Sequence, residues 1–325
     1  MDKMEEESKV STDVCSLPSW YSKFKEVTIE TKLIHLSMDF IQYLQSDGIV
    51  LPKGCELPAH ATEGRCDSNS DEDGSDWDDE GSSDAMRPSF PQLVKTIFES
   101  IQELGGSVFP KLNWSSPKDA AWINCDNTLR CTVPAEVVLL LKSSDIISDT
   151  IASLIDKSGQ DSAFTLCLRK WINVHPSGEF RCFIKDKRLI GVSQRQISNC
   201  YKHLLDSIES IMTDISCFFE DNHISNKFPL RNFVMDVYRP CKGSVLLLDF
   251  NPFDKAVTNP LLFSWDELNR VAPVLPELRL VDPSSGIQPS QSVASRLPKD
   301  AVDLATGEDI HKLVDLLKIQ KKTED

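Results

Sequence analysis

Two apolar segments, each with a single aspartate, constrain the fold of this chain most strongly. They are FVMDVY, residues 233–238, and LLLDFNPF, residues 246–253. The stretch PCKG between them predicts a turn, so we expect a β-hairpin. A carboxylate inside a buried strand costs several kcal/mol unless it is paired or bound to a metal. Each aspartate therefore needs a partner.

The second strand also carries an asparagine beside its aspartate. Asp249 and Asn251 lie two positions apart, so both side chains point to one face of a strand, and Asp236 lies beside them if the hairpin forms. Two carboxylates and an amide oxygen suit Mg²⁺ that is bridged to phosphate groups. Alternatively, these residues only shape the exit of the strand into Pro252. From the pattern alone, both interpretations have equal weight.

Lysines occur earlier, in FPKLNWSSPKDAAW, residues 109–122. Lys111 follows an apolar strand, and Lys118 and Asp119 follow a turn of small residues that includes Ser116. A phosphate-binding loop needs cations and free backbone N–H groups. Taken alone, however, this segment fits a plain surface turn better.

A second cationic segment is LCLRKWINVHPSGEFRCF, residues 166–183. Arg169 and Trp171 share one face of the expected strand, Lys170 takes the other, and Arg181 follows on the next strand. These cations suit an anionic ligand. An internal ion pair between Glu179 and Arg181 is the alternative.

An acidic segment divides the chain. Residues 67–84 contain nine carboxylates and no Lys or Arg, so this run holds −9 of the net charge of −15 and leaves −6 for the rest. Such a segment buries too little apolar surface to fold, and we expect a disordered acidic loop over residues 64–87. The acidic balance argues against a nucleic-acid partner.

The cysteines indicate a reducing compartment. The ten Cys form no C-x-x-C motif, which argues against a zinc site and favours buried free thiols. His175 has no partner at ligand or triad spacing, so we assign no catalytic residue. The polar N-terminus and the lack of a long apolar run predict a cytoplasmic protein without membrane contact.

Hydrophobic periodicity predicts α+β architecture, because helices alternate with strands and hairpins. The predicted helices span residues 39–44, 90–104, 134–141, 204–219, 264–271 and 309–318. The further predicted strands span residues 27–36, 107–112, 164–171, 180–184 and 188–194.

The order of several motifs resembles the cell division cycle protein 123 family, over nearly the whole chain. These motifs are KLNWSSPKDAAWI, LRKW, EFRCFI, LIGVSQR, DVYR, LLLDFNPF and RLPKDAVDLATGED. The resemblance implies an ATP-grasp-like fold, in which two α+β lobes enclose a cleft for ATP and magnesium. We accordingly expect an N-terminal part of the core at 1–63, the acidic loop at 64–87, a first lobe at 88–165 and a second lobe with a C-terminal extension at 166–325.

The resemblance also implies a function. Family members are ATP-dependent assembly chaperones for eukaryotic translation initiation factor 2. They bind its gamma subunit and promote assembly with the alpha and beta subunits, which supports translation initiation and cell-cycle progression. We expect a monomer. The alternative is an ATP-grasp ligase that activates a carboxylate as an acyl phosphate, although no nucleophile or base is evident for it.

The residues implied to contact ATP are those that match the family motifs: Lys111, Asn113, Ser116, Lys118, Asp119, Arg169, Lys170, Trp171, Arg181, Gln194, Arg195, Asp236, Asp249 and Asn251. Of these, Asp236, Asp249 and Asn251 are implied to hold Mg²⁺.

Overall fold

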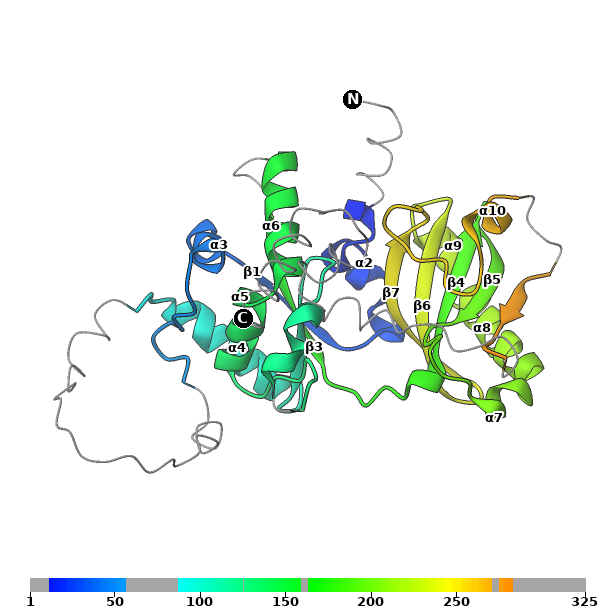
Figure 1. Ribbon diagram of the computed structural model, residues 1–325, viewed down its shortest axis with the longest axis horizontal. Coiled ribbons are helices and arrows are strands. Elements are labelled where there is room, and N and C mark those ends of the chain that lie inside the picture. Colours follow the sequence, from blue (N-terminus) through cyan, green and yellow to red (C-terminus); the bar gives the residue numbers. More distant parts are fainter. Residues whose placement is uncertain (1–11, 57–86, 125, 159–162, 271–274, 283–325) are drawn as a thin grey trace, which may run out of the picture.

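Two β-sheets, each with its own helices, make up the part of the chain that the computed structural model describes (Figure 1). That part comprises residues 12–56, 87–124, 126–158, 163–270 and 275–282. The α+β class predicted from the sequence is confirmed.

The first sheet has three antiparallel strands in the order β1-β3-β2. Its strands are β1 (Thr31–His35), β3 (Thr165–Lys170) and β2 (Val108–Leu112). Four helices share one apolar core with this sheet: α3 (Met38–Gln45), α4 (Pro91–Glu103), α5 (Pro134–Lys142) and α6 (Asp145–Ser158). Helix α4 ends before Gly105 and Gly106, whose positive φ angles of 93° and 84° stop the helix.

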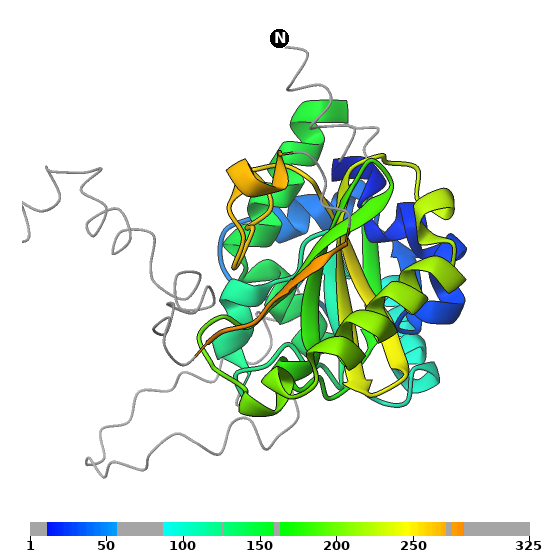
Figure 2. The same cartoon turned by 90° about the vertical axis from the view of Figure 1, so that its right-hand side faces the viewer.

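The second sheet has five strands in the order β7-β6-β4-β5-β8, and only the β5–β8 pair is parallel. Its strands are β4 (Glu179–Lys185), β5 (Arg188–Gln194), β6 (Phe233–Cys241), β7 (Ser244–Pro252) and β8 (Glu277–Arg279). The helices of this half are α2 (Leu17–Phe24), α7 (Lys202–Leu205), α8 (Ile208–Asp221), α9 (Ile224–Lys227) and α10 (Trp265–Leu268). Figure 2 shows the yellow-green helix α8 crossing one face of the sheet.

Strand alternation sorts the side chains of this sheet onto two faces. Phe233, Met235 and Val237 of β6 pack into the core formed with α2 and α8. The alternate residues Val234 and Asp236 therefore point to the opposite face, where Val234 packs with α10. Arg181 of β4 and Asp236 of β6 thus lie on the face away from α8.

The same alternation orients the first sheet toward the second. Leu166 and Leu168 of β3 pack with helices α3 to α6, whereas Cys167 belongs to the core of the five-stranded sheet. Lys111 of β2 is the register partner of Cys167, and Arg169 is two residues further along β3. Lys111 and Arg169 therefore face the five-stranded sheet.

Most elements predicted from periodicity are confirmed, including the hairpin of β6 and β7. The helix predicted over 204–219 is instead two helices, α7 and α8, separated at residues 206–207. Helices α6 and α9 and strand β8 were not predicted. The acidic loop lies outside the described residues except for its last residue, and the helix predicted over 309–318 lies outside them entirely. None of the described helices is long and apolar enough to cross a membrane.

The division into lobes differs from the one drawn from the sequence. Strand β3 pairs with β1 and β2, so residues 165–170 belong to the first sheet and not to the second lobe beginning at 166. The N-terminal part is shared, since α2 packs with the five-stranded sheet and β1 belongs to the other. The reason is long-range pairing between strands distant in sequence, which local patterns do not reveal.

Candidate functional site

Three neighbouring strands bring charged residues together on the face away from α8. Arg181 of β4 is the register partner of Asp236 of β6, and Asp236 is in turn the register partner of Asp249 of β7. Paired residues on adjacent antiparallel strands point to the same face. The register alone therefore aligns one arginine and two carboxylates in a row.

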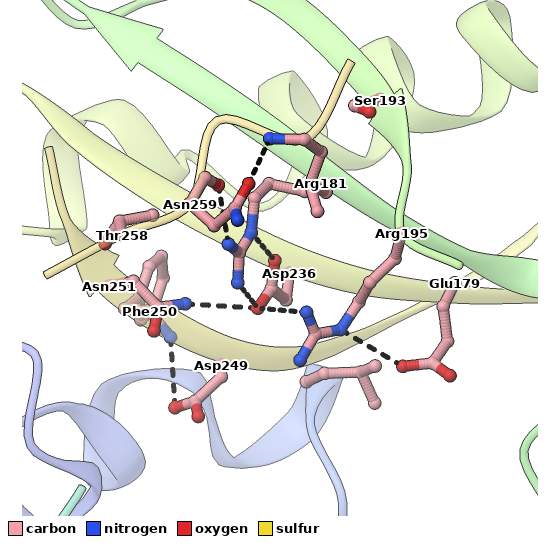
Figure 3. A network of polar contacts seen from close by, with 12 residues as sticks. Glu179, Arg181, Ser193, Arg195, Asp236, Asp249, Phe250, Asn251, Thr258 and Asn259 are labelled. Carbon is pink, nitrogen blue, oxygen red and sulfur yellow. Dashed lines mark hydrogen bonds and ion pairs between the residues drawn. The ribbon is translucent and has the colours of Figure 1, made fainter. Parts of the chain in front are cut away.

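Asp236 is held by a bidentate ion pair (Figure 3). Arg181 donates from Nε to Oδ1 and from Nη2 to Oδ2, both at 2.8 Å, and Asn251 donates its side-chain N–H to Oδ2 at 3.1 Å. Arg195 approaches Oδ2 to 3.7 Å. Burial alone would raise the pKa of Asp236, but the charges of Arg181 and Arg195 outweigh it and hold that pKa well below its usual value.

Asp249 has a partner from the other sheet. Lys111 Nζ lies 2.5 Å from Asp249 Oδ2, and the Lys111 side chain is 4% exposed. The Phe250 backbone N–H donates to Oδ1 of Asp249 at 3.1 Å. The Asp249 side chain remains 24% exposed, whereas that of Asp236 is 3% exposed. Asp249 is thus the more accessible carboxylate, at the junction of the two sheets.

Two further cations complete this junction. Arg195 pairs with Glu179 at 3.3 Å, so the alternative pairing of Glu179 with Arg181 is not the one adopted. Lys118 is exposed but lies in the field of Arg195 and Lys111. Loss of hydration beside the neighbouring protein atoms is the largest cause that lowers the pKa of Lys118, and the positive charges of Arg195 and Lys111 are the next. Together they bring that pKa to about 8.

Arg169 links the two sheets from a buried position. Its Nη1 donates to the Leu248 carbonyl at 2.6 Å, and its Nη2 donates to Thr28 Oγ1 at 3.0 Å. Thr28 in turn donates to the Leu247 carbonyl at 2.8 Å. Arg169 is 2% exposed, and its Nε is buried without a hydrogen-bond partner among the described residues. Arg169 therefore anchors β7 immediately before Asp249.

The junction carries a local excess of positive charge. Five cations (Lys111, Lys118, Arg169, Arg181 and Arg195) meet three carboxylates (Glu179, Asp236 and Asp249), which leaves two net positive charges. The whole chain has a net charge of −15. An excess of cations in so acidic a protein suits an anionic ligand.

The remaining side chains implied by the resemblance make other contacts. Both ends of the Asn113 amide bond the backbone, at Ala163 and Thr165, and Asp119 accepts hydrogen bonds from Ser144 Oγ and the Ile146 N–H at the start of α6. These two side chains organise the chain around the junction.

The side chain of Gln194 is also hydrogen-bonded to the backbone. Its amide group donates to the carbonyls of Gln196 and Asn199 and accepts from the N–H of Val281, so it joins β5 to the segment after β8. Ser116 is buried, and its carbonyl accepts the Lys118 N–H.

Two predicted residues, at and just after the end of β3, also make other contacts. Lys170 is exposed and pairs with Glu30 at 3.7 Å, and Trp171 donates its indole N–H to Asn173. The sequence reasoning missed two groups that hold the cations in place: Glu179 as the counter-ion of Arg195, and the Asn259 carbonyl, which accepts from Arg181 Nη1 at 2.9 Å. A backbone carbonyl leaves no sequence signal.

The oxygen atoms at the junction fit a hard metal ion that is shared with phosphate groups. Asp236, Asp249 and Asn251 offer carboxylate and amide oxygens, the ligands that Mg²⁺ prefers. Among the described residues, no group of three or more His, Cys, Asp or Glu side chains is arranged to hold a metal ion.

Comparisons with known proteins agree on one family. A family model described as D123 matches residues 20–305. The translation initiation factor eIF2 assembly protein of Xenopus tropicalis is 39% identical over 325 residues, covering 96% of this chain and 96% of the relative. Cell division cycle protein 123 of Phaeosphaeria nodorum is 40% identical over 272 residues, covering 81% of this chain and 69% of the relative.

A solved structure shares the fold. The structure of Cdc123 from Schizosaccharomyces pombe matches with a TM-score of 0.67 and 34% sequence identity, over 85% of this chain and 98% of that one. The two-sheet arrangement is thus common to both proteins.

Proposed function

The chain belongs to the D123 family, and from this premise we propose that it is an assembly protein for translation initiation factor eIF2 that binds ATP and Mg²⁺ at the junction of its two sheets. The names of the relatives support the assembly role. The two-sheet fold and the charges at the junction support an ATP-grasp-like nucleotide site.

The observation that carries the nucleotide site is the cation-rich junction around Asp236 and Asp249. In this proposal Lys111, Lys118 and Arg195 would contact the phosphate groups of ATP, and Asp236, Asp249 and Asn251 would hold Mg²⁺. When bound, Mg²⁺ neutralises phosphate charge and fixes the orientation of the phosphate chain.

A nucleotide bound at the junction would also have a structural role, because it would contact both sheets. Lys111 belongs to the three-stranded sheet, whereas Asp249 belongs to the five-stranded sheet. A ligand that contacts both residues stabilises one relative position of the two sheets. We infer that ATP in this way stabilises the form of the protein that binds eIF2.

The names of the relatives favour an assembly role over a ligase role, and the cysteines near the junction offer no nucleophile for covalent catalysis. Cys15, Cys167 and Cys182 lie in the field of Asp249 or Asp236, and burial raises the pKa of each thiol, to about 12 for Cys167. These thiols stay protonated at neutral pH and are poor nucleophiles. His175 Nδ1 is engaged locally by Ser177 Oγ at 2.8 Å.

The finer proposal concerns the partner. We propose that the protein acts as a monomer in the cytoplasm, binds the gamma subunit of eIF2 and promotes its joining with the alpha and beta subunits. It needs neither nucleic acid nor a membrane for this step.

Reconstitution tests the proposal. The gamma subunit is mixed with alpha and beta, with ATP and Mg²⁺, and the yield of the complete complex is measured by native mass spectrometry. The chain should raise that yield, and Asp249→Ala should not. Asp186→Ala is the matched control, because Asp186 is an exposed aspartate in the β4–β5 turn, where it pairs with Arg231.

Two outcomes would count against the proposal. A yield that does not depend on the chain would remove the assembly role. Formation of an acyl phosphate from a small carboxylate would favour the ligase alternative.

A further inference from the structure

Both carboxylates among the three metal-ligand candidates already have a protein cation as partner. Arg181 binds both oxygens of Asp236, and Lys111 binds one oxygen of Asp249. The negative charge that would attract a divalent cation is therefore neutralised within the protein.

The two ion pairs differ in how firmly they are fixed. Arg181 makes two hydrogen bonds to Asp236 and a third to the Asn259 carbonyl, and its side chain is 8% exposed. Lys111, which is 4% exposed, makes a single ion pair to Asp249, whose side chain is 24% exposed. Lys111 is thus held to its carboxylate by fewer bonds than Arg181, and Asp249 is the carboxylate that an incoming anion exposes when it draws Lys111 away.

Free Mg²⁺ has two further disadvantages at this junction. The eight charged groups leave two net positive charges, which repel a cation and attract a polyphosphate. Mg²⁺ also demands six oxygen ligands in octahedral geometry. The described residues offer no cluster of three or more acidic, His or Cys ligands.

From these observations, and resting on the proposed nucleotide site, we propose that this is an anion-gated metal site in which Lys111 is the gate. A polyphosphate binds to Lys111, Lys118 and Arg195 whether or not a metal is present. Its negative charge draws Lys111 away from Asp249, and only then do the oxygens of Asp249 and the phosphates together bind the metal. The protein consequently takes up the metal with the nucleotide and not before it.

Two binding measurements without turnover test this order. Mn²⁺ replaces Mg²⁺, and loss of its free electron paramagnetic resonance signal reports binding without nucleotide. Calorimetry with ATP and EDTA reports nucleotide binding without metal. Wild-type protein should bind ATP in EDTA but should bind no Mn²⁺ through Asp249 when nucleotide is absent.

Three variants distinguish the proposed role of Lys111 from a general effect of removing a positive charge. Lys111→Met should raise the affinity for free Mn²⁺ and lower the affinity for ATP in EDTA, each by about tenfold. Lys32→Met is the matched control, because Lys32 belongs to β1 of the same sheet and pairs with Glu103 away from the junction. Arg195→Gln is a milder second variant, since Arg195 is 27% exposed, and it should lower ATP affinity without exposing Asp249.

Comparison between variants is essential because the nine carboxylates of residues 67–84 offer weak Mn²⁺ sites in every variant. Mn²⁺ that wild-type protein binds without nucleotide and that Asp249→Ala fails to bind would overturn the gate, while the nucleotide site would stand. Lys111→Met with both affinities unchanged would also overturn it. If wild-type protein binds no ATP even with Mg²⁺, the proposed nucleotide site fails, and the gate fails with it.

Discussion

Replacing Arg169 with Met should weaken the contact between the two sheets and lower the free energy of unfolding. The same change at the next residue, Lys170, should have little effect. Arg169 of β3 reaches across to β7 and binds the Leu248 carbonyl and Thr28 Oγ1. Its guanidinium also lies 5.7 Å from the centre of the Phe109 ring. Lys170 points the other way, is exposed, and pairs with Glu30 at 3.7 Å.

The expected cost follows from these contacts. Two hydrogen bonds from a charged donor contribute about 3–6 kcal/mol together, and removing the buried Nε that lacks a partner returns about 1–3 kcal/mol. The net loss for Arg169→Met is therefore about 3 kcal/mol, or roughly 6 °C in Tm for a protein of this size. Lys170→Met should cost less than about 1 kcal/mol, because an exposed ion pair contributes little.

Thermal and urea unfolding of the two variants measure this difference, and ATP affinity provides a second readout. Arg169→Met should also weaken ATP binding, because the Leu248 carbonyl that it holds directly precedes Asp249. Equal stability of the two variants, or a loss below about 1 kcal/mol for Arg169→Met, would refute the assignment of Arg169 as the anchor between the sheets.

Three other outcomes are expected. The depressed pKa of Asp236 means that the unfolded chain takes up the proton first, so the stability from this ionised group is complete above about pH 5 and declines below about pH 4. Urea unfolding should show a loss of about 1 kcal/mol at pH 3 that Asp236→Asn lacks, and a parallel decline in both proteins would contradict this. Gly178→Ala should lower the free energy of unfolding by about 2 kcal/mol, because the new Cβ would lie 2.7 Å from the Arg239 carbonyl and from the Tyr238 ring; an unchanged free energy of unfolding would show that the backbone yields easily. Deletion of residues 67–84 should leave ATP affinity and Tm unchanged, and a large fall in Tm would mean that the acidic run packs after all.

Local patterns predicted the parts of the site that lie within one hairpin. The alternation of FVMDVY and LLLDFNPF and the turn between them predict β6 and β7, and the spacing of Asp249 and Asn251 predicts a shared face. The same pattern also fitted a simple strand exit. The partner carboxylate Asp236, the cations earlier in the chain and the ordered family motifs together favoured a nucleotide site.

Contacts between distant segments were beyond such patterns. Lys111 and Asp249 are 138 positions apart, and Arg181 meets Asp236 only because β4 lies between β5 and β6. The assignment of β3 to the second lobe failed for the same reason. Helix α6, with the sequence DIISDTIASLIDKS, was not predicted, although its buried residues Ile147, Ile151 and Leu154 follow helical spacing.

Residue type alone also left the tasks of some side chains undecided. Asn113, Asp119 and Gln194 occur in the family motifs, yet their polar groups bond the surrounding chain. A polar residue beside a ligand site either contacts the ligand or shapes the loop that does. Burial and hydrogen bonds distinguish these tasks, and neither is visible in the sequence.

Calorimetry of ATP binding in the presence of Mg²⁺ tests the central claim most directly. Wild-type protein and the control Asp186→Ala should bind ATP with one-to-one stoichiometry and more tightly with Mg²⁺ than in EDTA, whereas Asp249→Ala should remain folded and lose the gain in affinity that Mg²⁺ provides. The Asp249 side chain is 24% exposed, so the fold should stay intact although Lys111 loses its ion-pair partner. Unchanged ATP affinity in a folded Asp249→Ala variant would contradict the assignment of the nucleotide and metal site to the junction of the two sheets.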